Sequence, residues 1–433
     1  MRDKAFTRER KLTFSKMIVL MTQKSVKSLQ NILNEAEVYL SNLLNTKLVT
    51  VTKGAYTQAR EKLNYTAFIE LCHDIRDQFY DQYEYAAYKD FRLLGIDGSL
   101  ITLPDEEGTR EAFGTVNVIN QHKDKNKQIV QARVSLLYDL LNGVVIDAMI
   151  TDRKTHEITI AKDEHFTALK RGDLVIFDRS YPSYEIFAAI THKHKADYLI
   201  RVKKSTYKKY TEPLFDKNSK DKDITVTITP PTKTLREEMI AQNLPLELKV
   251  RFVQVILPDG EVEVLATSIL DHEVLKLTDF RELYFKRWKI ETFYDIVKNR
   301  LSLENFTGTT PLAIRQDFYA TMFISNIEAL VSYDINEEFK EEKNSKKIDR
   351  RKKYEQKVNK SVSFNTIKNH CFDLFFSDKD IDEILEKIYQ LLKTNKVAIR
   401  PDRQFKRPDA EEGKITKGIK SANYQRRQKK IVY

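Results

Sequence analysis

The apolar pattern of residues 91–202 constrains the fold more than any other feature, because it places strands first and then alternates helix with strand. Two apolar runs flank Asn142-Gly143, the strongest short signal for a β-hairpin. The continuous apolar run at 174–177 is typical of a strand buried on both faces. This order predicts an α/β protein with a mixed sheet covered by helices, and it is compatible with a ribonuclease-H-like core.

The rest of the chain divides into further regions. Period-two alternation within residues 204–270 predicts a β-rich insertion domain, and helical periodicity predicts helices before and after the sheet. The expected organisation is a helical domain at 1–88, the first part of the core at 89–203, the insertion domain at 204–270, the second part of the core with a helix carrying Glu291 at 271–340, and a helical and basic C-terminal region at 341–433.

Composition describes a globular protein. The 433 residues are 41% hydrophobic and 10% aromatic, enough for a substantial core. No run approaches the roughly 20 apolar residues of a membrane span, and the charged Met1 end lacks the apolar stretch of a secretory signal. We therefore expect a cytoplasmic location and no membrane partner. Cys72 and Cys371 are the only cysteines, so neither a disulfide framework nor a Cys-based zinc site is expected.

The net charge favours a polyanionic partner. The chain carries a formal charge of +11, and Lys and Arg gain affinity for nucleic acid by releasing condensed counterions. The charge is uneven, because twelve Lys or Arg residues and only four acidic residues follow from Lys396 to the end. This basic tail either contacts DNA or a second subunit, or it is simply a solubilising end.

Residues 52–63 contain a candidate recognition helix. Thr52 is a suitable N-cap, and the segment resembles the second helix of a helix-turn-helix domain. An ordinary bundle helix with a solvated polar face explains the pattern equally well. The candidate DNA contacts are Lys53, Tyr56, Gln58, Arg60 and Lys62.

A second helical segment carries an unusual stripe. Tyr284, Arg287, Glu291 and Lys298 follow one another at offsets of three, four and seven residues. On one continuous α-helix, at about 100° per residue, their side chains fall within an arc of roughly 60°. The stripe presents a carboxylate between two cations and a phenol. Taken alone, it is more often a salt-bridged surface, in which each pair contributes only about 0.2–0.5 kcal/mol.

Two further carboxylates stand on predicted strands. Asp97 lies in the sequence Gly95-Ile-Asp-Gly-Ser99, where glycines permit close approach of a backbone or a phosphate. Asp178 ends the buried run at 174–177, where an unpaired charge is costly. Each residue also has a simpler interpretation: Asp97 makes a turn, and Asp178 caps the following helix or pairs with Arg179.

The three carboxylates together predict a metal site. Asp97, Asp178 and Glu291 offer an all-oxygen set that suits Mg²⁺ or Mn²⁺. Two such ions about 3.5–4 Å apart activate a nucleophile and stabilise the leaving oxygen of a phosphodiester. His156 and His194 are expected to be structural, because these metals do not need imidazole.

At these residues the chain resembles the DDE transposases of bacterial insertion sequences, in the branch called the IS-four family. Its signature is Tyr-x2-Arg-x3-Glu-x6-Lys, which Tyr284, Arg287, Glu291 and Lys298 match at every spacing. Asp97 resembles the first Asp of the family. Asp178, in Phe-Asp-Arg-Ser-Tyr, resembles the second, with Ser180 in place of the customary Gly. Similarity extends to residues 55–63, 265–270 and 314–319 and so covers most of the chain.

The resemblance implies a DNA transposase with a ribonuclease-H-like catalytic domain. Such enzymes use divalent metal, Mg²⁺ or Mn²⁺, at the Asp97, Asp178 and Glu291 positions to cut transposon ends and join them to target DNA. Tyr284, Arg287 and Lys298 would contact DNA phosphates, and the insertion domain would help hold a DNA hairpin. The implied partners are double-stranded DNA with terminal inverted repeats, target DNA, and a second subunit in a synaptic dimer. The implied location is the bacterial cytoplasm, at the nucleoid when bound to DNA.

Two alternatives use the same sequence. A catalytically silent DNA-binding regulator is disfavoured, because it has no chemical need for three costly carboxylates. A metal-dependent nuclease that cleaves without strand transfer requires the same residues, so the sequence does not separate it from a transposase.

Overall fold

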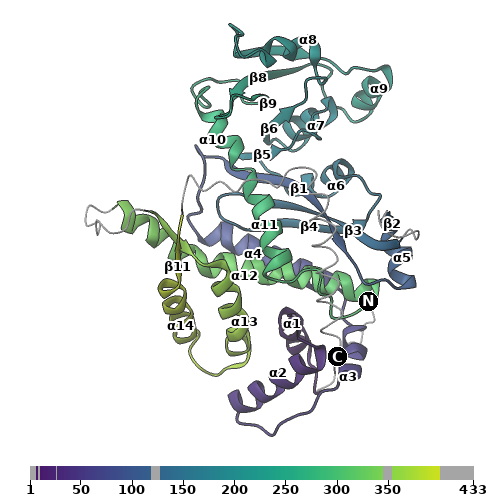
Figure 1. The fold of residues 1–433 in the computed structure, drawn as a ribbon, viewed down its shortest axis with the longest axis vertical. Coiled ribbons are helices and arrows are strands. Elements are labelled where there is room, and N and C mark those ends of the chain that lie inside the picture. Colours follow the sequence, from purple (N-terminus) through teal and green to yellow (C-terminus); the bar gives the residue numbers. More distant parts are fainter. Residues whose placement is uncertain (1–5, 8–9, 26, 119–126, 345–353, 400–433) are drawn as a thin grey trace. The chain divides into compact units, whose positions relative to one another are not determined.

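The computed structural model describes residues 6–7, 10–25, 27–118, 127–344 and 354–399, and its elements separate into two units. Unit 1 comprises Met1–Ile75, Leu103–Ala112 and Asp295–Tyr433, and unit 2 comprises Arg76–Thr102 and Phe113–Tyr294. Figure 1 follows the chain through both. Most of the basic tail lies outside the described residues. No helix of the described part of the chain is long and apolar enough to cross a membrane.

The core of unit 2 is a mixed sheet. Strands β1, β5 and β6 run parallel, β3 is antiparallel to β1, and β4 is antiparallel to β3, so the order across the core is β4-β3-β1-β5-β6. This arrangement is the ribonuclease-H-like α/β core that the sequence predicted. The core strands are β1 (Arg92–Thr102), β3 (Lys127–Asp139), β4 (Val145–Asp152), β5 (Asp173–Phe177) and β6 (Asp197–Val202), and β2 (Thr115–Val118) pairs with the start of β3.

Local sequence determines how these strands begin and turn. Gly143 adopts φ +78°, a left-handed conformation that glycine accepts without strain, and it closes the predicted hairpin between β3 and β4. At the start of β1 and β5, the buried Arg92 guanidinium donates two hydrogen bonds of 2.7 Å to the Asp173 carboxylate. This ion pair fixes where the two parallel strands start relative to one another.

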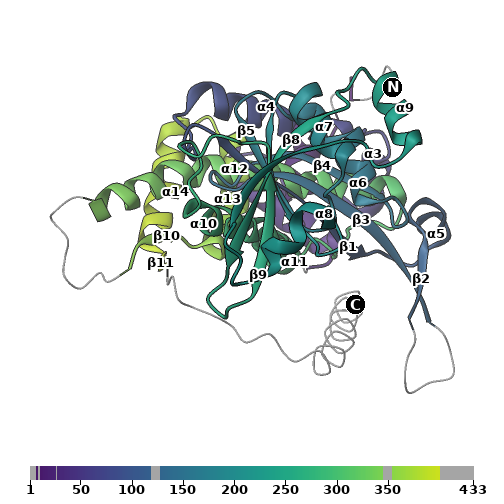
Figure 2. The same ribbon diagram turned by 90° about the horizontal axis from the view of Figure 1, so that it is seen from above.

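The predicted β-rich insertion extends the same sheet. Strand β9 (Val262–Thr267) is antiparallel to β6, with Ala266 opposite Ile200, and β8 (Leu248–Ile256) and β7 (Asp223–Ile228) follow in turn. The sheet therefore has nine strands among the described residues, and the insertion does not form a sheet of its own. Figure 2 views the strands from above.

Helices complete unit 2. The interior strand β5 is fully buried along its length, as its apolar run predicted. The helices are α6 (Glu157–Asp163), α7 (Tyr184–Ala188) with a π-helical turn at Ala189–Lys193, α8 (Lys208–Thr211), α9 (Lys233–Ala241), α10 (Asp279–Phe285) and the first part of α11 (Trp288–Asn299), with 3-10 turns at His165–Ala168 and Glu212–Phe215.

Unit 1 is helical. Its first three helices start at the N-caps Thr13, Ser28 and Thr52, each of which accepts a hydrogen bond from a backbone N–H of the first turn. A long helix and two that follow it share an apolar cluster that includes Ile335, Ile384 and Ile388. The helices are α1 (Phe14–Thr22), α2 (Leu29–Leu43), α3 (Lys53–Arg60), α4 (Thr66–Gln82, which continues into unit 2), α5 (Glu107–Phe113), α12 (Pro311–Asn344), α13 (Lys360–Phe376) and α14 (Ile381–Thr394), with a small ladder of β10 (Gln356–Val358) and β11 (Lys396–Ala398).

Candidate active site

Two of the predicted aspartates belong to neighbouring strands of unit 2. Strands β1 and β5 are parallel, and the last residues that pair are Gly95 and Ile176. Asp97 lies on β1 two residues beyond this pair, and Asp178 directly follows the last residue of β5. Both predicted aspartates therefore follow the same end of the parallel pairing.

The Asp97 carboxyl occupies a costly environment. Its Oδ1 accepts a hydrogen bond of 2.9 Å from the Gly98 N–H. Burial, more than any other cause, raises the pKa of Asp97 to about 7, against a partial opposing effect from that hydrogen bond and from the charge of Arg287. The negative charges of Glu291 and Glu157 raise this pKa further. A cation at this position would relieve the cost of ionising Asp97.

Helix α11 is tied to the strand of Asp97. The Tyr294 hydroxyl donates a hydrogen bond of 2.8 Å to the Asp97 carbonyl oxygen. The Phe293 ring stacks on Tyr138 of β3, with ring centroids 4.5 Å apart. Glu291 lies about one helical turn before Tyr294, on the same side of α11. This attachment is what brings the predicted glutamate to the end of the sheet that carries the two aspartates.

The predicted single helix is wrong. Helix α10 ends at Phe285 and α11 begins at Trp288, so Arg287 lies in a turn between them and the four signature residues do not share one helical stripe. The turn still lets the buried Arg287 donate a hydrogen bond of 2.8 Å to Glu291. Arg287 also lies over the Tyr284 ring, 5.8 Å from its centroid.

Asp178 is held by its own turn. Its Oδ1 accepts hydrogen bonds from the Ser180 N–H, at 2.7 Å, and from the Ser180 hydroxyl. The serine that departs from the family pattern thus supplies an additional donor to the carboxylate. The described residues contain no ion pair between Asp178 and Arg179. Burial raises the pKa of Tyr284 to about 12, and the negative charge of Asp178 makes a smaller contribution in the same direction.

Glu157 is a site residue that the sequence did not reveal. It begins α6, forms an ion pair with Arg133 of β3, and packs against Gly98. A Cβ added to Gly98 would lie 2.7 Å from Glu157 Oε1, so a side chain at this position would force the Glu157 side chain to shift. An acidic residue in the first turn of a short helix ordinarily indicates no more than a favourable interaction with the helix dipole, which is why its role was not recognisable.

Three buried hydrogen-bond donors near the candidate carboxylates have no partner in the described part of the chain. Tyr181 is 1% exposed, and the charges of Glu157, Asp97 and Asp178 all act on its hydroxyl. Within the part of the chain that the structure describes, that hydroxyl and the Nε atoms of Arg133 and Arg287 are buried without a hydrogen-bond partner. Buried polar atoms are nearly always paired. These three donors can pair with acceptor oxygens such as those of water or phosphate.

The donor set fits a hard divalent cation, but the carboxylates are not gathered around one point. Among the described residues, no three of the His, Cys, Asp and Glu side chains lie close enough to hold a metal ion. Instead Asp178 binds the Ser180 turn and Glu291 binds Arg287. Oxygen ligands of this type are those that Mg²⁺ and Mn²⁺ prefer.

The N-terminal candidates divide into two groups. Lys53, Gln58 and Lys62 are exposed at α3. Tyr56 and Arg60 are 1% and 3% exposed, so their side chains do not face a DNA duplex, and the sequence interpretation is wrong for these two. The helix turns them into the interior of unit 1. There the Arg60 guanidinium donates to Gln316, Thr307, the Ala313 carbonyl and Asp317 at 2.8–3.0 Å.

The structure gives the positions of the remaining candidates, Lys298, His156 and His194. Lys298 lies on the last turn of α11 and belongs to unit 1, so its contact with phosphate stays a prediction. His156 is the N-cap residue of α6 and makes no side-chain capping hydrogen bond. Burial lowers the pKa of His194, whose ring packs edge-on against Phe166 with centroids 5.9 Å apart.

Comparison with known proteins identifies the family. The family model described as the transposase DDE domain matches residues 89–327, more than half of the 433-residue chain. No curated protein matches the chain. Among solved structures, the cryo-EM structure of a piggyBac transposase synaptic complex with hairpin DNA matches 95% of this chain and 83% of that chain, at 12% identity and a TM-score of 0.41. The match over residues 89–327 shows that the chain belongs to the family of proteins with a transposase DDE domain.

Proposed function

We propose that the protein is a cut-and-paste DNA transposase that cleaves insertion-sequence ends and joins them to target DNA. The observation that carries the proposal is the placement of Asp97 on β1 and of Asp178 directly after the parallel neighbour β5, beside a helix that carries Glu291 and is bonded to the strand of Asp97. The spacing of Tyr284 and Lys298 about this glutamate supports placement in the IS-four branch of bacterial elements.

We assign Asp97, Asp178 and Glu291 as the residues that would hold Mg²⁺ or Mn²⁺, two ions in the proposed reaction. When bound, such ions activate a water or 3′-hydroxyl nucleophile and stabilise the leaving oxygen of the phosphodiester. The buried Asp97 carboxyl, whose pKa burial and the charges of Glu291 and Glu157 raise to about 7, supports a site that favours positive charge. Arg287 contacts Glu291 through Oε1, which leaves the second carboxylate oxygen as the candidate metal ligand.

Arg287 and Tyr284 are proposed to bind the scissile phosphate. The Arg287 guanidinium, with its unpaired Nε, presents donors in the planar arrangement that matches phosphate oxygens. Tyr284, whose pKa is raised to about 12 by burial, keeps its proton at neutral pH and can donate it in a hydrogen bond. Glu157 positions the site through Arg133 and does not itself touch the phosphate in this scheme.

The proposed DNA contacts begin with exposed side chains of the N-terminal region. Lys53 and Gln58 on α3, and Lys62 just after it, remain candidates for contacts with terminal inverted repeats. Lys298 is proposed to bind phosphate near the cleaved end. The reaction is proposed to take place in a bacterial cytoplasm, in a synaptic dimer, with a hairpin intermediate as the route by which the second strand opens.

The products of one reaction separate the candidate functions. Protein, Mg²⁺ and duplexes covering the DNA that flanks the coding region are incubated with a supercoiled target plasmid. Joined products are expected. Hydrolysis without joining would instead identify a nuclease, and binding without cleavage a silent regulator. A hairpin at the cleaved insertion-sequence end is visible on a denaturing gel as a product that migrates at twice the strand length.

Single variants test the residue assignments. Asp97→Ala, Asp178→Ala and Glu291→Ala should each abolish cleavage while end binding persists, because the metal ligands contribute little to duplex affinity. Asp221→Ala, an exposed aspartate of the same unit, is the matched control. A variant of the first three that cuts at the wild-type rate is not missing a metal ligand.

A further inference from the structure

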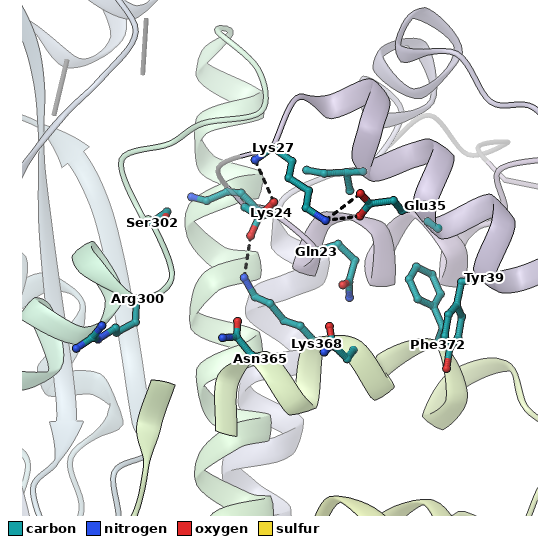
Figure 3. Close-up of a pocket in the computed structure, with 14 residues that line it drawn as sticks. Gln23, Lys24, Lys27, Glu35, Tyr39, Arg300, Ser302, Asn365, Lys368 and Phe372 are labelled. Atoms are coloured by element: carbon teal, nitrogen blue, oxygen red, sulfur yellow. Dashed lines mark hydrogen bonds and ion pairs between the residues drawn. The ribbon is translucent and has the colours of Figure 1, made fainter. Parts of the chain in front are cut away.

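Unit 1 contains a cavity that the proposed reaction does not use. Its volume is about 700 Å³, and its walls are one face of α2, one face of α13, the connection between α1 and α2, and the segment after α11 (Figure 3). The α13 residues are Asn365, Lys368, Asn369 and Phe372, spaced as neighbours on one helical face. All lining residues belong to unit 1, so the cavity is a feature of that unit alone.

The lining is strongly cationic. Four basic side chains line the cavity, Lys24, Lys27, Arg300 and Lys368, against the single acid Glu35. Glu35 is already occupied, because Lys27 Nζ lies 2.7 Å from one of its oxygens. Figure 3 shows this pair at the top of the cavity, and Lys368 reaching up from α13. Positive charge therefore exceeds the acidic charge available within the cavity.

Two of the lysines are shielded from solvent, Lys24 almost completely and Lys368 in part. Lys24 is 4% exposed and donates a hydrogen bond of 2.8 Å to the Leu303 carbonyl oxygen. Lys368 donates a hydrogen bond of 2.8 Å to the Lys24 carbonyl oxygen. Burial lowers the pKa of both side chains to about 8, and the charge of Lys368 lowers that of Lys24 further. A carbonyl carries no formal charge, so these bonds orient the ammonium groups without neutralising them.

The acids near Lys24 do not complete the compensation. Asp317 and Glu304 both raise the pKa of Lys24, in opposition to burial. Asp317, however, forms its ion pair with Arg60 at 2.8 Å, and Arg60 itself lowers the pKa of Lys24. Holding like charges together in a desolvated position is costly unless an anion accompanies them. The cavity is thus prepared for an anionic group.

Neutral donors and rings indicate which anion. Amide groups of Gln23, Asn365 and Asn369 and the hydroxyl of Ser302 line the same space. At one end, the rings of Tyr39 and Phe372 lie 5.9 Å apart, and Tyr39 is partly exposed. Phosphate accepts from ammonium, guanidinium and amide groups, and aromatic side chains provide platforms for bases. A strand of nucleic acid offers both kinds of group, whereas free phosphate offers only the first.

We propose that this cavity binds a phosphate of a nucleic-acid strand, with Lys24, Lys368 and Arg300 supplying the positive charge and the Tyr39 and Phe372 rings lying beside the adjoining nucleotide. The site is additional to the carboxylate site, because none of its residues belongs to unit 2. It would give the proposed transposase a DNA-binding site that does not depend on metal.

Lysine footprinting tests the proposal directly. The full chain, in EDTA, is labelled with an amine-acylating reagent alone, with inorganic phosphate, with single-stranded oligothymidylate or with duplex DNA, and is then digested for mass spectrometry. Labelling of Lys368 should fall at least about tenfold with a DNA strand and little with inorganic phosphate, since a charged hydrogen bond shields the amine. Exposed Lys379 on the same unit is the internal control.

Substitution completes the test. Arg300→Ala combined with Lys368→Ala should weaken strand binding at least about tenfold and lower the salt slope by about 1 for each phosphate that the variant no longer neutralises. Lys379→Ala should leave both unchanged, and circular dichroism confirms folding of each variant. Arg300→Ala alone serves if the double variant does not fold. Unchanged Lys368 labelling with DNA, equal protection by inorganic phosphate, or unchanged binding by a folded variant would each overturn the proposal. Because metal is absent, failure of the catalytic assignment would not alter these results.

Discussion

Replacing Asp97 with Asn should make the metal-free protein more stable at neutral and alkaline pH. The amide retains an oxygen that can accept the hydrogen bond from the Gly98 N–H, which is 2.9 Å long in the structure. It removes the negative charge that burial, Glu291 and Glu157 make unfavourable. The variant therefore isolates the cost of ionising this carboxyl in the folded chain.

The size of the effect follows from the pKa of Asp97, which is raised from 3.8 to about 7. Each unit corresponds to about 1.36 kcal/mol, which gives about 4 kcal/mol as an upper limit. Solvent screening at a partly exposed carboxyl reduces this to about 1–3 kcal/mol. Because the folded pKa is raised, the stabilisation by the protonated form is complete below pH 3.8 and is lost as pH rises to about 7.

Urea unfolding in EDTA, measured between about pH 5 and pH 8, gives the free energies. Trp288 is the only tryptophan of the chain and lies in unit 2, so its fluorescence reports the unit that contains Asp97. Wild-type stability should fall relative to Asp97→Asn across this range, while the exposed control Asp221→Asn follows the wild type. Adding Mg²⁺ should stabilise the wild type and leave Asp97→Asn nearly unchanged, since ligand stabilises only a fold that binds it.

If the free energies of unfolding of wild type and Asp97→Asn keep a constant difference from about pH 5 to pH 8, the ionisation of Asp97 does not destabilise the fold. That result would mean that ionised Asp97 is compensated within the chain and has no need of a cation. Equal stabilisation of both proteins by Mg²⁺ would place the metal elsewhere.

Three further substitutions have defined outcomes. Arg60→Ala should lower the free energy of unfolding by about 3–5 kcal/mol, measured by circular dichroism in urea, because Asp317 loses its buried cation; a stable variant with weakened DNA binding would instead support the recognition-helix interpretation. Gly98→Ala should displace the Glu157 side chain and lower the cleavage rate of a folded protein, since the new Cβ would stand 2.7 Å from the Glu157 carboxylate; cleavage at the wild-type rate would contradict this. Lys62→Ala should lower the salt slope of duplex binding by about 1, and an unchanged slope would remove it from the DNA contacts.

The elements that form the site could be predicted because they depend on local patterns. The run ending at Asp178 indicates a buried strand through its composition alone, and Asn142-Gly143 indicates a hairpin through its turn chemistry. Parallel pairing of β1 and β5 then brings Asp97 and Asp178 to the same end of the paired segment.

The errors depend on contacts between distant parts of the sequence. Arg60 lies in a segment with the sequence pattern of a DNA-binding helix. Its buried partner Asp317, however, lies 257 residues away in the sequence. Glu157 gains its role from Arg133 and Gly98, on strands that precede it. The break at Arg287 preserves the burial of the apolar residues on either side, so hydrophobic periodicity continues across it and conceals the turn.

Direct measurement of metal binding tests whether Asp97, Asp178 and Glu291 hold the divalent metal. Mn²⁺ is titrated into wild type, Asp97→Asn, Asp178→Asn and Glu291→Gln, each bound to flanking DNA, and free Mn²⁺ is counted by electron paramagnetic resonance. The wild type should bind Mn²⁺ tightly, and each variant should lose at least one ion or much of its affinity. Wild-type binding by all three variants would contradict this assignment, because the metal would then be held by other residues.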